Sequence, residues 1–208
     1  MDGLIGKKVG MTEVWDAEGH RVAVTVLEVG PCPVVQVKSK DADGYDAVQV
    51  GFEAQKPQRL TKAVRTRFEK AGVAPCRVLK EFDAEGDAVK VGDTLNVSVF
   101  EGVGLVDVTA ITKGKGFAGV VRRWGMAGGP HGHGGHSKRR IGSIGERDLP
   151  GWIAKGKHMP GHMGAVQRTA RNLAVVQVRK DDNVLLIRGA VPGPAGQTVI
   201  VRKALKKA

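Results

Sequence analysis

The sequence predicts a mainly β protein, a closed β-barrel that carries a long, irregular, glycine-rich basic extension and one or two short helices. Two observations lead to this prediction. Many short segments rich in β-branched residues are separated by close turns, which is typical of barrels. One stretch of 53 residues holds too much glycine and charge to form a core of its own. The whole chain has 208 residues, 30 of them glycine, and a formal net charge of +12.

The predicted strands flank the extension on both sides. In residues 21–29, Val22, Val24 and Val26 alternate with the side chains of the opposite face. The other segments with β-rich composition are 34–38, 47–52, 77–82, 95–100, 105–111, 173–179, 184–188 and 198–202. One helix is predicted where Thr61 can cap a segment that places Leu60, Val64, Phe68 and Ala71 on one face, and Gly72 ends it.

The charge is unevenly distributed along the chain. Residues 112–164 hold 15 glycines, 10 Lys or Arg and two acids, a net charge of +8, and residues 202–208 add +4. The remaining 148 residues contain 19 basic and 19 acidic side chains. We therefore divide the chain into a barrel body (1–111 and 165–201), an extended basic Gly/His-rich arm (112–164) and a basic C-terminal tail (202–208).

Several classes of protein are excluded by composition. No apolar stretch approaches the ~20 residues of a membrane span, and the N-terminus does not have the pattern of a secretory signal, so we expect a cytoplasmic protein. Cys32 and Cys76 lie 44 positions apart without a second Cys or His at metal spacing. We expect two buried thiols rather than a disulfide or a zinc site.

Residues 114–119 (GKGFAG) match the dinucleotide-binding fingerprint and follow a predicted strand. A Rossmann unit also needs a full helix after the glycines and an acid ~20 residues further on. Here Gly125 ends the candidate helix 120–124, and the next acid is Glu146. A backbone that approaches phosphates closely explains these glycines better than a nucleotide-dependent enzyme does.

Three histidines, His131, His133 and His136, could be drawn as transition-metal ligands, but no Cys or carboxylate accompanies them. The alternative is that these histidines donate hydrogen bonds to phosphates and stack on bases. No nucleophile with a base and no separated pair of carboxylates indicates catalysis, since Glu146 and Asp148 flank Arg147 and favour ion pairing with it. We therefore predict no metal, no cofactor and no small-molecule substrate.

A flexible cationic arm that gains order among phosphates suits structured RNA better than duplex DNA, which is usually read by a rigid helix or ribbon. The expected RNA-binding residues are the cations, histidines and aromatic residues of the arm, with a few on the body. They are Lys7, Lys8, Lys113, Lys115, Phe117, Arg122, Arg123, Trp124, His131, His133, His136, Lys138, Arg139, Arg140, Ser143, Arg147, Trp152, Lys155, Lys157, His158, His162 and Arg168.

Ordered motifs along the chain resemble the bacterial L-three family of large-subunit ribosomal proteins. The motifs are GLIGKKVGMT (3–12), DVT (107–109), KGKGFAGVVRRW (113–124), GSIG (142–145), KGK (155–157), GHMG (161–164) and GAVPG (189–193). The sequence departs from the family at Ala110-Ile111, where Gly-Thr is frequent, and at Ile141, where Pro is common. Asp148 replaces a Gln that is methylated in some members.

The resemblance implies a barrel of the type seen in translation factors and a non-enzymatic protein of the large ribosomal subunit. It implies primary binding of large-subunit ribosomal RNA near its 3′ end, a role in starting subunit assembly, and an arm that reaches toward the peptidyl transferase centre. Residues 145–152 would form the inner tip of the arm, with Arg147 and Trp152 in contact with RNA. The expected protein partners belong to the L-fourteen and L-nineteen families.

Overall fold

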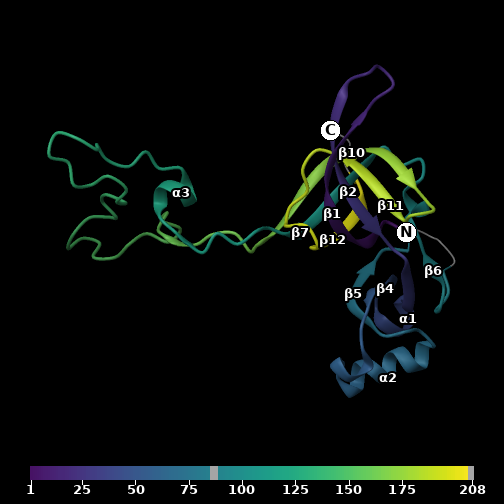
Figure 1. Ribbon diagram of the computed structural model, residues 1–208. Helices are drawn as coiled ribbons and strands as arrows, with labels where there is room; N and C mark the ends of the chain where they lie inside the picture. The colour runs from purple at the N-terminus through teal and green to yellow at the C-terminus, as the bar shows by residue number, and fades with distance from the viewer. Residues whose placement is uncertain (85–88, 206–208) are drawn as a thin grey trace. The chain divides into compact units, whose positions relative to one another are not determined.

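The computed structural model describes residues 1–84 and 89–205, so the last three residues of the basic tail lie outside it. The chain divides into two compact units (Figure 1). One is the body, Met1–Ile111 with Gln167–Ala208, and the other is the insertion, Thr112–Val166. No helix among the described residues is long and apolar enough to cross a membrane.

The body contains a closed barrel of six antiparallel strands, as the sequence predicted. Each strand pairs with its two neighbours, and β1 pairs with β2 to complete the ring. In the order of pairing, the strands are β1 (Gly3–Trp15), β12 (Thr198–Lys203), β7 (Leu105–Ile111), β10 (Gln167–Arg179), β11 (Val184–Arg188) and β2 (Arg21–Val29).

A second sheet shares its hydrophobic core with the barrel. Its strands are β5 (Cys76–Phe82), β4 (Ala47–Ala54), β3 (Cys32–Lys38) and β6 (Thr94–Leu95), in that order. Alternate residues of the barrel strands, such as Val106 and Val108 of β7, are fully buried, and Phe82 of β5 belongs to the same cluster. All members of this cluster belong to the body.

Helix α2 (Lys62–Ala71) covers a smaller cluster, in which Phe68 packs with Val35 and Cys76. The predicted inner face and the Gly72 terminator are confirmed, since Leu60, Val64 and Ala71 pack here and Gly72 has φ 65°. Thr61 is the N-cap residue but makes no hydrogen bond with its side chain. The remaining short helices of the body are α1 (Lys40–Asp43), η1 (Pro57–Arg59) and η2 (Val97–Phe100).

Both cysteines are free and buried, as expected. Burial raises the pKa of the Cys32 thiol to about 12, and it also raises the pKa of Cys76. Both side chains are therefore protonated at neutral pH and act as small apolar residues of the core.

The strands of the structure differ from the sequence-based expectation in two places. Strand β1 was not predicted, because its glycines obscure the β pattern. Gly6 is needed for close strand packing, since a Cβ there would lie 2.6 Å from the carbonyl oxygen of Glu28. The strand predicted at 95–100 is wrong: after two residues of β6 the chain forms η2, in which Val97 and Phe100 are both buried. Their spacing of three residues is that of a 3₁₀ turn.

Lys8 is 8% exposed, so it does not present its charge on the surface as an RNA contact requires. Its ammonium donates hydrogen bonds to the carbonyl oxygens of Val191, at 2.7 Å, and Gly193, at 3.1 Å. These bonds tie β1 to the loop between β11 and β12. Lys7, its neighbour, is partly exposed and forms an ion pair of 3.4 Å with Glu53.

We expect Lys8→Met to lower the free energy of unfolding by about 2–4 kcal/mol, because two carbonyl groups lose a charged donor while the apolar stem is kept. Urea unfolding followed by circular dichroism measures the change. Lys7→Met is the matched control and should cost less than about 1 kcal/mol, since the lost ion pair is partly exposed and makes a single contact of 3.4 Å. Equal losses for the two variants would contradict a structural role specific to Lys8.

Because both core clusters lie entirely in the body, we expect the body to fold without most of the insertion. The test is a protein in which residues 125–157 are replaced by a short Gly-Ser linker. It should remain soluble, unfold cooperatively and keep a near-UV circular dichroism spectrum with fixed aromatic signals. A molten spectrum would refute the proposed division of the chain into body and arm.

Candidate nucleic-acid interface

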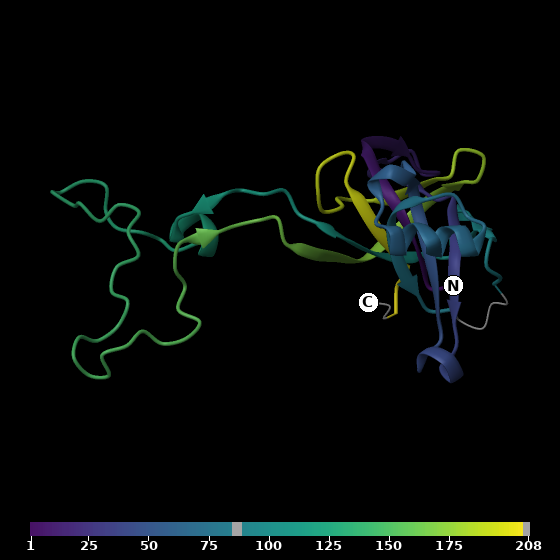
Figure 2. The same cartoon turned by 90° about the horizontal axis from the view of Figure 1, so that it is seen from below.

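The two ends of the insertion form an antiparallel stem, and its two sides run next to each other in both ribbon views (Figures 1 and 2). The amide of Lys115 donates to the carbonyl of Met163 at 2.8 Å, and that of Met163 donates to Gly116 at 2.9 Å. Strands β8 (Phe117–Ala118) and β9 (Gly161–His162) continue the pairing. The backbone is thus held in the stem, while the side chains of Lys113 and Lys115 remain exposed.

Glycine is required in this stem by close backbone contact. Gly164 has φ 76°, and a Cβ at this position would collide with the carbonyl oxygen of Lys113. The stem can therefore be narrow only because residue 164 has no side chain. The pairing of the two sides of the stem thus explains why the GHMG motif ends in glycine at position 164.

A compact junction follows the stem, where α3 (Val120–Trp124) packs on residues 158–161. The Arg123 guanidinium and the Trp124 indole N–H both donate to the carbonyl oxygen of Met159, at 2.7 and 2.9 Å. The Trp124 ring stacks on His158, with centroids 4.0 Å apart and an interplanar angle of 3°. Three predicted RNA-binding residues are therefore brought together, although two of them also fix the local fold.

Close packing at the junction depends on Gly161. A Cβ on this residue would lie 2.7 Å from Nη1 of Arg123, so a larger residue would displace the guanidinium. Ala118, which pairs with Gly161, and Val120 of α3 are buried. The junction is the part of the insertion where apolar burial, aromatic stacking and hydrogen bonding combine.

The three histidines of the HGHGGH run lie in a loop, and the base of this loop is closed by hydrogen bonds. The amide of Gly129 donates to the carbonyl of Lys138 at 2.8 Å. His131, His133 and His136 are all exposed. They do not come together as metal ligands, since no group of three or more His, Cys, Asp or Glu in residues 1–84 and 89–205 could hold a metal ion. Lys138, Arg139 and Arg140 follow the loop and are exposed too.

Every residue of the segment predicted as the inner tip, 145–152, is exposed. Arg147 and Trp152 lie in this segment, with Trp152 61% accessible, and Ser143, just before it, is exposed too. Leu149, which sequence reasoning did not select, is 83% exposed. The expected ion pair of Arg147 with Glu146 or Asp148 is absent from the described part of the chain, so the Arg147 guanidinium is available to another anion.

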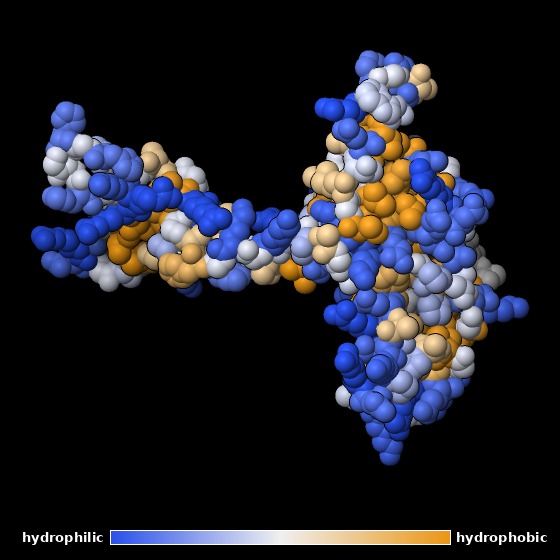
Figure 3. All heavy atoms as spheres, viewed as in Figure 1, coloured by the Kyte–Doolittle hydropathy of each residue, from blue (hydrophilic) through white to orange (hydrophobic). Residues whose placement is uncertain are grey.

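Electrostatic imbalance is the dominant property of the insertion. It contains ten Lys or Arg and two acids, and no ion pair forms within 112–166, all of which the structure describes. In the body, by contrast, carboxylates such as Glu53 and Glu81 pair with lysines. Figure 3 shows hydrophilic residues over most of the visible surface of the insertion, interrupted by apolar patches. A surface with this composition fits a polyanion.

The other predicted residues are distributed as follows. Those of the insertion not yet placed are exposed on the stem, on α3 and on the segment that returns from the tip: Phe117, Arg122, Lys155, Lys157 and His162. Arg168 is exposed on β10 of the body. Sequence reasoning missed Met159, whose carbonyl oxygen organises the junction. No sequence signal marks it, because the contact uses the backbone and spans 35 residues.

The structure does not support the dinucleotide-binding alternative. Residues 114–119 belong to the stem and to β8, and the strand before them, β7, pairs antiparallel with both of its neighbours. Helix α3 has only five residues. A parallel βαβ unit, which the fingerprint requires, is absent around these glycines.

Known proteins resemble this chain over nearly its full length. A family model described as ribosomal protein L3 matches residues 73–183. The large ribosomal subunit protein uL3 of Magnetococcus marinus is 47% identical over 207 residues, which is 99% of this chain and 97% of that protein. The uL3 proteins of Brachyspira hyodysenteriae and Deinococcus radiodurans are each 45% identical, covering 100% and 99% of this chain and 96% of their own lengths. This extent of similarity shows that the chain belongs to the ribosomal protein L3 family.

Proposed function

We propose that this chain is a structural component of the large ribosomal subunit in the cytoplasm and that it binds large-subunit ribosomal RNA through the insertion. The observation that carries the proposal is the set of ten cations in 112–166 that have no ion-pair partner inside that segment. Ten unpaired cations beside two acids repel one another, and phosphates relieve that repulsion. Membership of the L3 family identifies the polyanion as ribosomal RNA.

The aromatic residues of the insertion add a second kind of contact. Phe117 is 80% exposed and Trp152 is 61% exposed, and neither is held by a ring contact in the structure. Large exposed rings cost free energy in water, and stacking on an unpaired base is worth about 1–3 kcal/mol per base. Cations that bind the backbone and rings that stack on bases together suit folded RNA with unpaired nucleotides.

The finer assignments rest on the family. We propose binding near the 3′ end of the large-subunit RNA, a role in starting subunit assembly, and a position of the 145–152 tip toward the peptidyl transferase centre. Proteins of the L-fourteen and L-nineteen families are the proposed neighbours. We also propose a non-enzymatic role, which the chemistry of the insertion supports because its side chains suit charge neutralisation and stacking rather than proton transfer.

The direct test of the proposed function is sedimentation. After lysis in moderate salt and magnesium, a tagged copy of the protein should migrate with large subunits through a sucrose gradient, because RNA contacts hold it there. An unrelated basic protein of similar size serves as the control for nonspecific charge. Recovery of the tagged protein only in the fractions of free soluble protein would overturn the proposal.

The contribution of the insertion is measured by the salt dependence of binding to transcribed large-subunit RNA. Each neutralised phosphate contributes about 0.7–0.9 to the slope of log affinity against log salt. Replacing Lys138, Arg139 and Arg140 by Gln should lower that slope by about 2–3. The control replaces Arg179, Lys180 and Arg188 of the body by Gln, with the same change in charge. Equal slopes for the two triple variants would show that the cations next to the histidine loop make no specific phosphate contacts.

A further inference from the structure

Residues 1–111 and 165–201 are formally neutral together, yet six of their 19 cations lie close together in one segment. The segment from Lys56 to Lys70, which comprises η1 and most of α2, contains six Lys or Arg and one acid. The six cations are Lys56, Arg59, Lys62, Arg65, Arg67 and Lys70. The acid, Glu69, forms an ion pair with Arg65 at 3.4 Å. The outer surface of α2 is therefore strongly cationic, although the sequence totals give no sign of it.

One side of α2 borders a groove with a volume of about 510 Å³. Thr66, Arg67 and Lys70 line it from the helix, and Gln36 and Val37 line it from β3. None of the lining residues is acidic. This composition contrasts with another hollow of the body, in which Lys7 lies with Glu28 and Glu53. The groove beside α2 thus offers two positive charges that no carboxylate of its wall neutralises.

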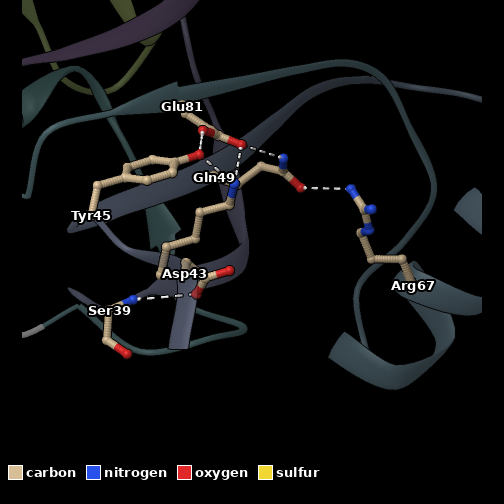
Figure 4. A network of polar contacts seen from close by, with 7 residues as sticks. Ser39, Asp43, Tyr45, Gln49, Arg67 and Glu81 are labelled. Atoms are coloured by element: carbon tan, nitrogen blue, oxygen red, sulfur yellow. Dashed lines mark hydrogen bonds and ion pairs between the residues drawn. The ribbon is translucent and has the colours of Figure 1, made fainter. Parts of the chain in front are cut away.

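A chain of hydrogen bonds holds one of these charges in place (Figure 4). Nη1 of Arg67 donates to Oε1 of Gln49 at 3.4 Å, and Nε2 of Gln49 donates to Glu81 at 3.2 Å. Because Glu81 accepts from the nitrogen of the amide, the amide oxygen is directed toward Arg67. Gln49 is 7% exposed, so the amide is fixed by its surroundings.

The same network keeps the charge of Arg67 uncompensated. Glu81 is paired with Lys38 at 2.8 Å and accepts from the Tyr45 hydroxyl at 2.8 Å, and these contacts hold the pKa of the Glu81 carboxyl below its usual range. A neutral amide, rather than a carboxylate, contacts Arg67. The guanidinium has five N–H donors, of which this bond uses one, so the remaining donors can serve a ligand.

We propose that the groove between α2 and β3 binds the phosphate backbone of ribosomal RNA, with Arg67 and Lys70 as the phosphate-binding residues. This inference rests on the proposed function and adds a site on the body that is independent of the insertion. The planar fork of Arg67 matches two phosphate oxygens, and Lys70 supplies a point charge beside it. Val37, 42% exposed on the wall, gives an apolar surface for a ribose or a base.

An acidic protein segment is the competing occupant, and the chemistry favours RNA over it. A groove with two cations, a hydroxyl and an amide matches the sugar–phosphate repeat, in which each charge is followed by a polar sugar. Members of this family belong to a particle in which RNA is the abundant polyanion. The binding experiment below separates the two occupants, since an acidic protein would leave RNA affinity unaffected by changes in the groove.

The test measures the affinity of the full-length protein for transcribed large-subunit ribosomal RNA at several salt concentrations. Arg67→Gln combined with Lys70→Gln should weaken binding about tenfold at moderate salt and lower the salt slope by about 1–2. The matched control is Arg179→Gln combined with Arg188→Gln, which removes the same charge from β10 and β11 and should weaken binding less than threefold. Thermal unfolding of each variant checks that α2 remains folded.

A second variant tests the groove without removing a cation. Ala63 lines the groove from an exposed position of α2, and Glu is a good helix former. Ala63→Glu should therefore leave stability unchanged and weaken RNA binding by a similar factor, because a carboxylate repels phosphate and competes for Arg67. Unchanged RNA affinity in both groove variants, or an equal loss in the control, would overturn the proposed site.

The outcomes also separate this inference from the proposed function. Suppose that the unmodified protein binds the RNA, that the triple variant of Lys138, Arg139 and Arg140 binds it more weakly, and that the groove variants bind it unchanged. The insertion is then the interface, and only the groove proposal fails. If the unmodified protein does not bind ribosomal RNA, both fail.

Discussion

The pairing of β7 with β10 is the contact on which both units of the structure depend. These strands lie on either side of the insertion in the sequence, and their register places Ile111 opposite Gln167. A hydrogen bond of 2.8 Å between the hydroxyls of Thr109 and Thr169 reinforces the pair. This ladder is therefore part of the closed barrel and also holds together the two residues from which the insertion departs. The entropy lost in closing so long a loop is offset by strand pairing in the body.

Because the body holds its two ends, the insertion does not need a hydrophobic core of its own. Its order comes from the antiparallel stem, from glycines that permit close backbone contact and from the junction of Arg123, Trp124 and His158 with the Met159 carbonyl. Beyond the junction, most side chains are exposed. A segment of this kind gains little from burial, so the positive charge it concentrates is not needed for its own folding. The repulsion among these positive charges is relieved only when a partner supplies negative charge next to them.

The sequence predicted the parts of this structure that depend on local pattern. Alternating residues of β7 and β12 and the inner face of α2 could be identified because burial follows the period of the element. In β2 the alternation of Val22, Val24 and Val26 did not predict burial, since Val24 and Thr25 are both buried and Leu27 and Val29 lie in the core. Strand β1 could not, since the glycines that let neighbouring strands approach, such as Gly6, also remove the alternation. In the candidate site, the exposed cations and rings were predictable from composition. The Met159 contact and the burial of Lys8 were not, because each depends on residues far away in the chain.

The net charge of the body also fails to predict which part of its surface is cationic. Summing over residues 1–111 and 165–201 gives zero, but mobile ions screen exposed charges over about 8 Å at physiological ionic strength, so distant acids do not neutralise α2. Of the acids nearby, Glu69 is paired with Arg65 and Glu81 with Lys38. Other acids of the body lie elsewhere, for example in the β1–β2 turn, where Asp16 accepts hydrogen bonds from backbone amides and Glu18 approaches His20. A partner that binds at α2 therefore meets a cationic surface whatever the total. The charge that matters for recognition is the charge within one screening length of the ligand, and only the fold determines which residues those are.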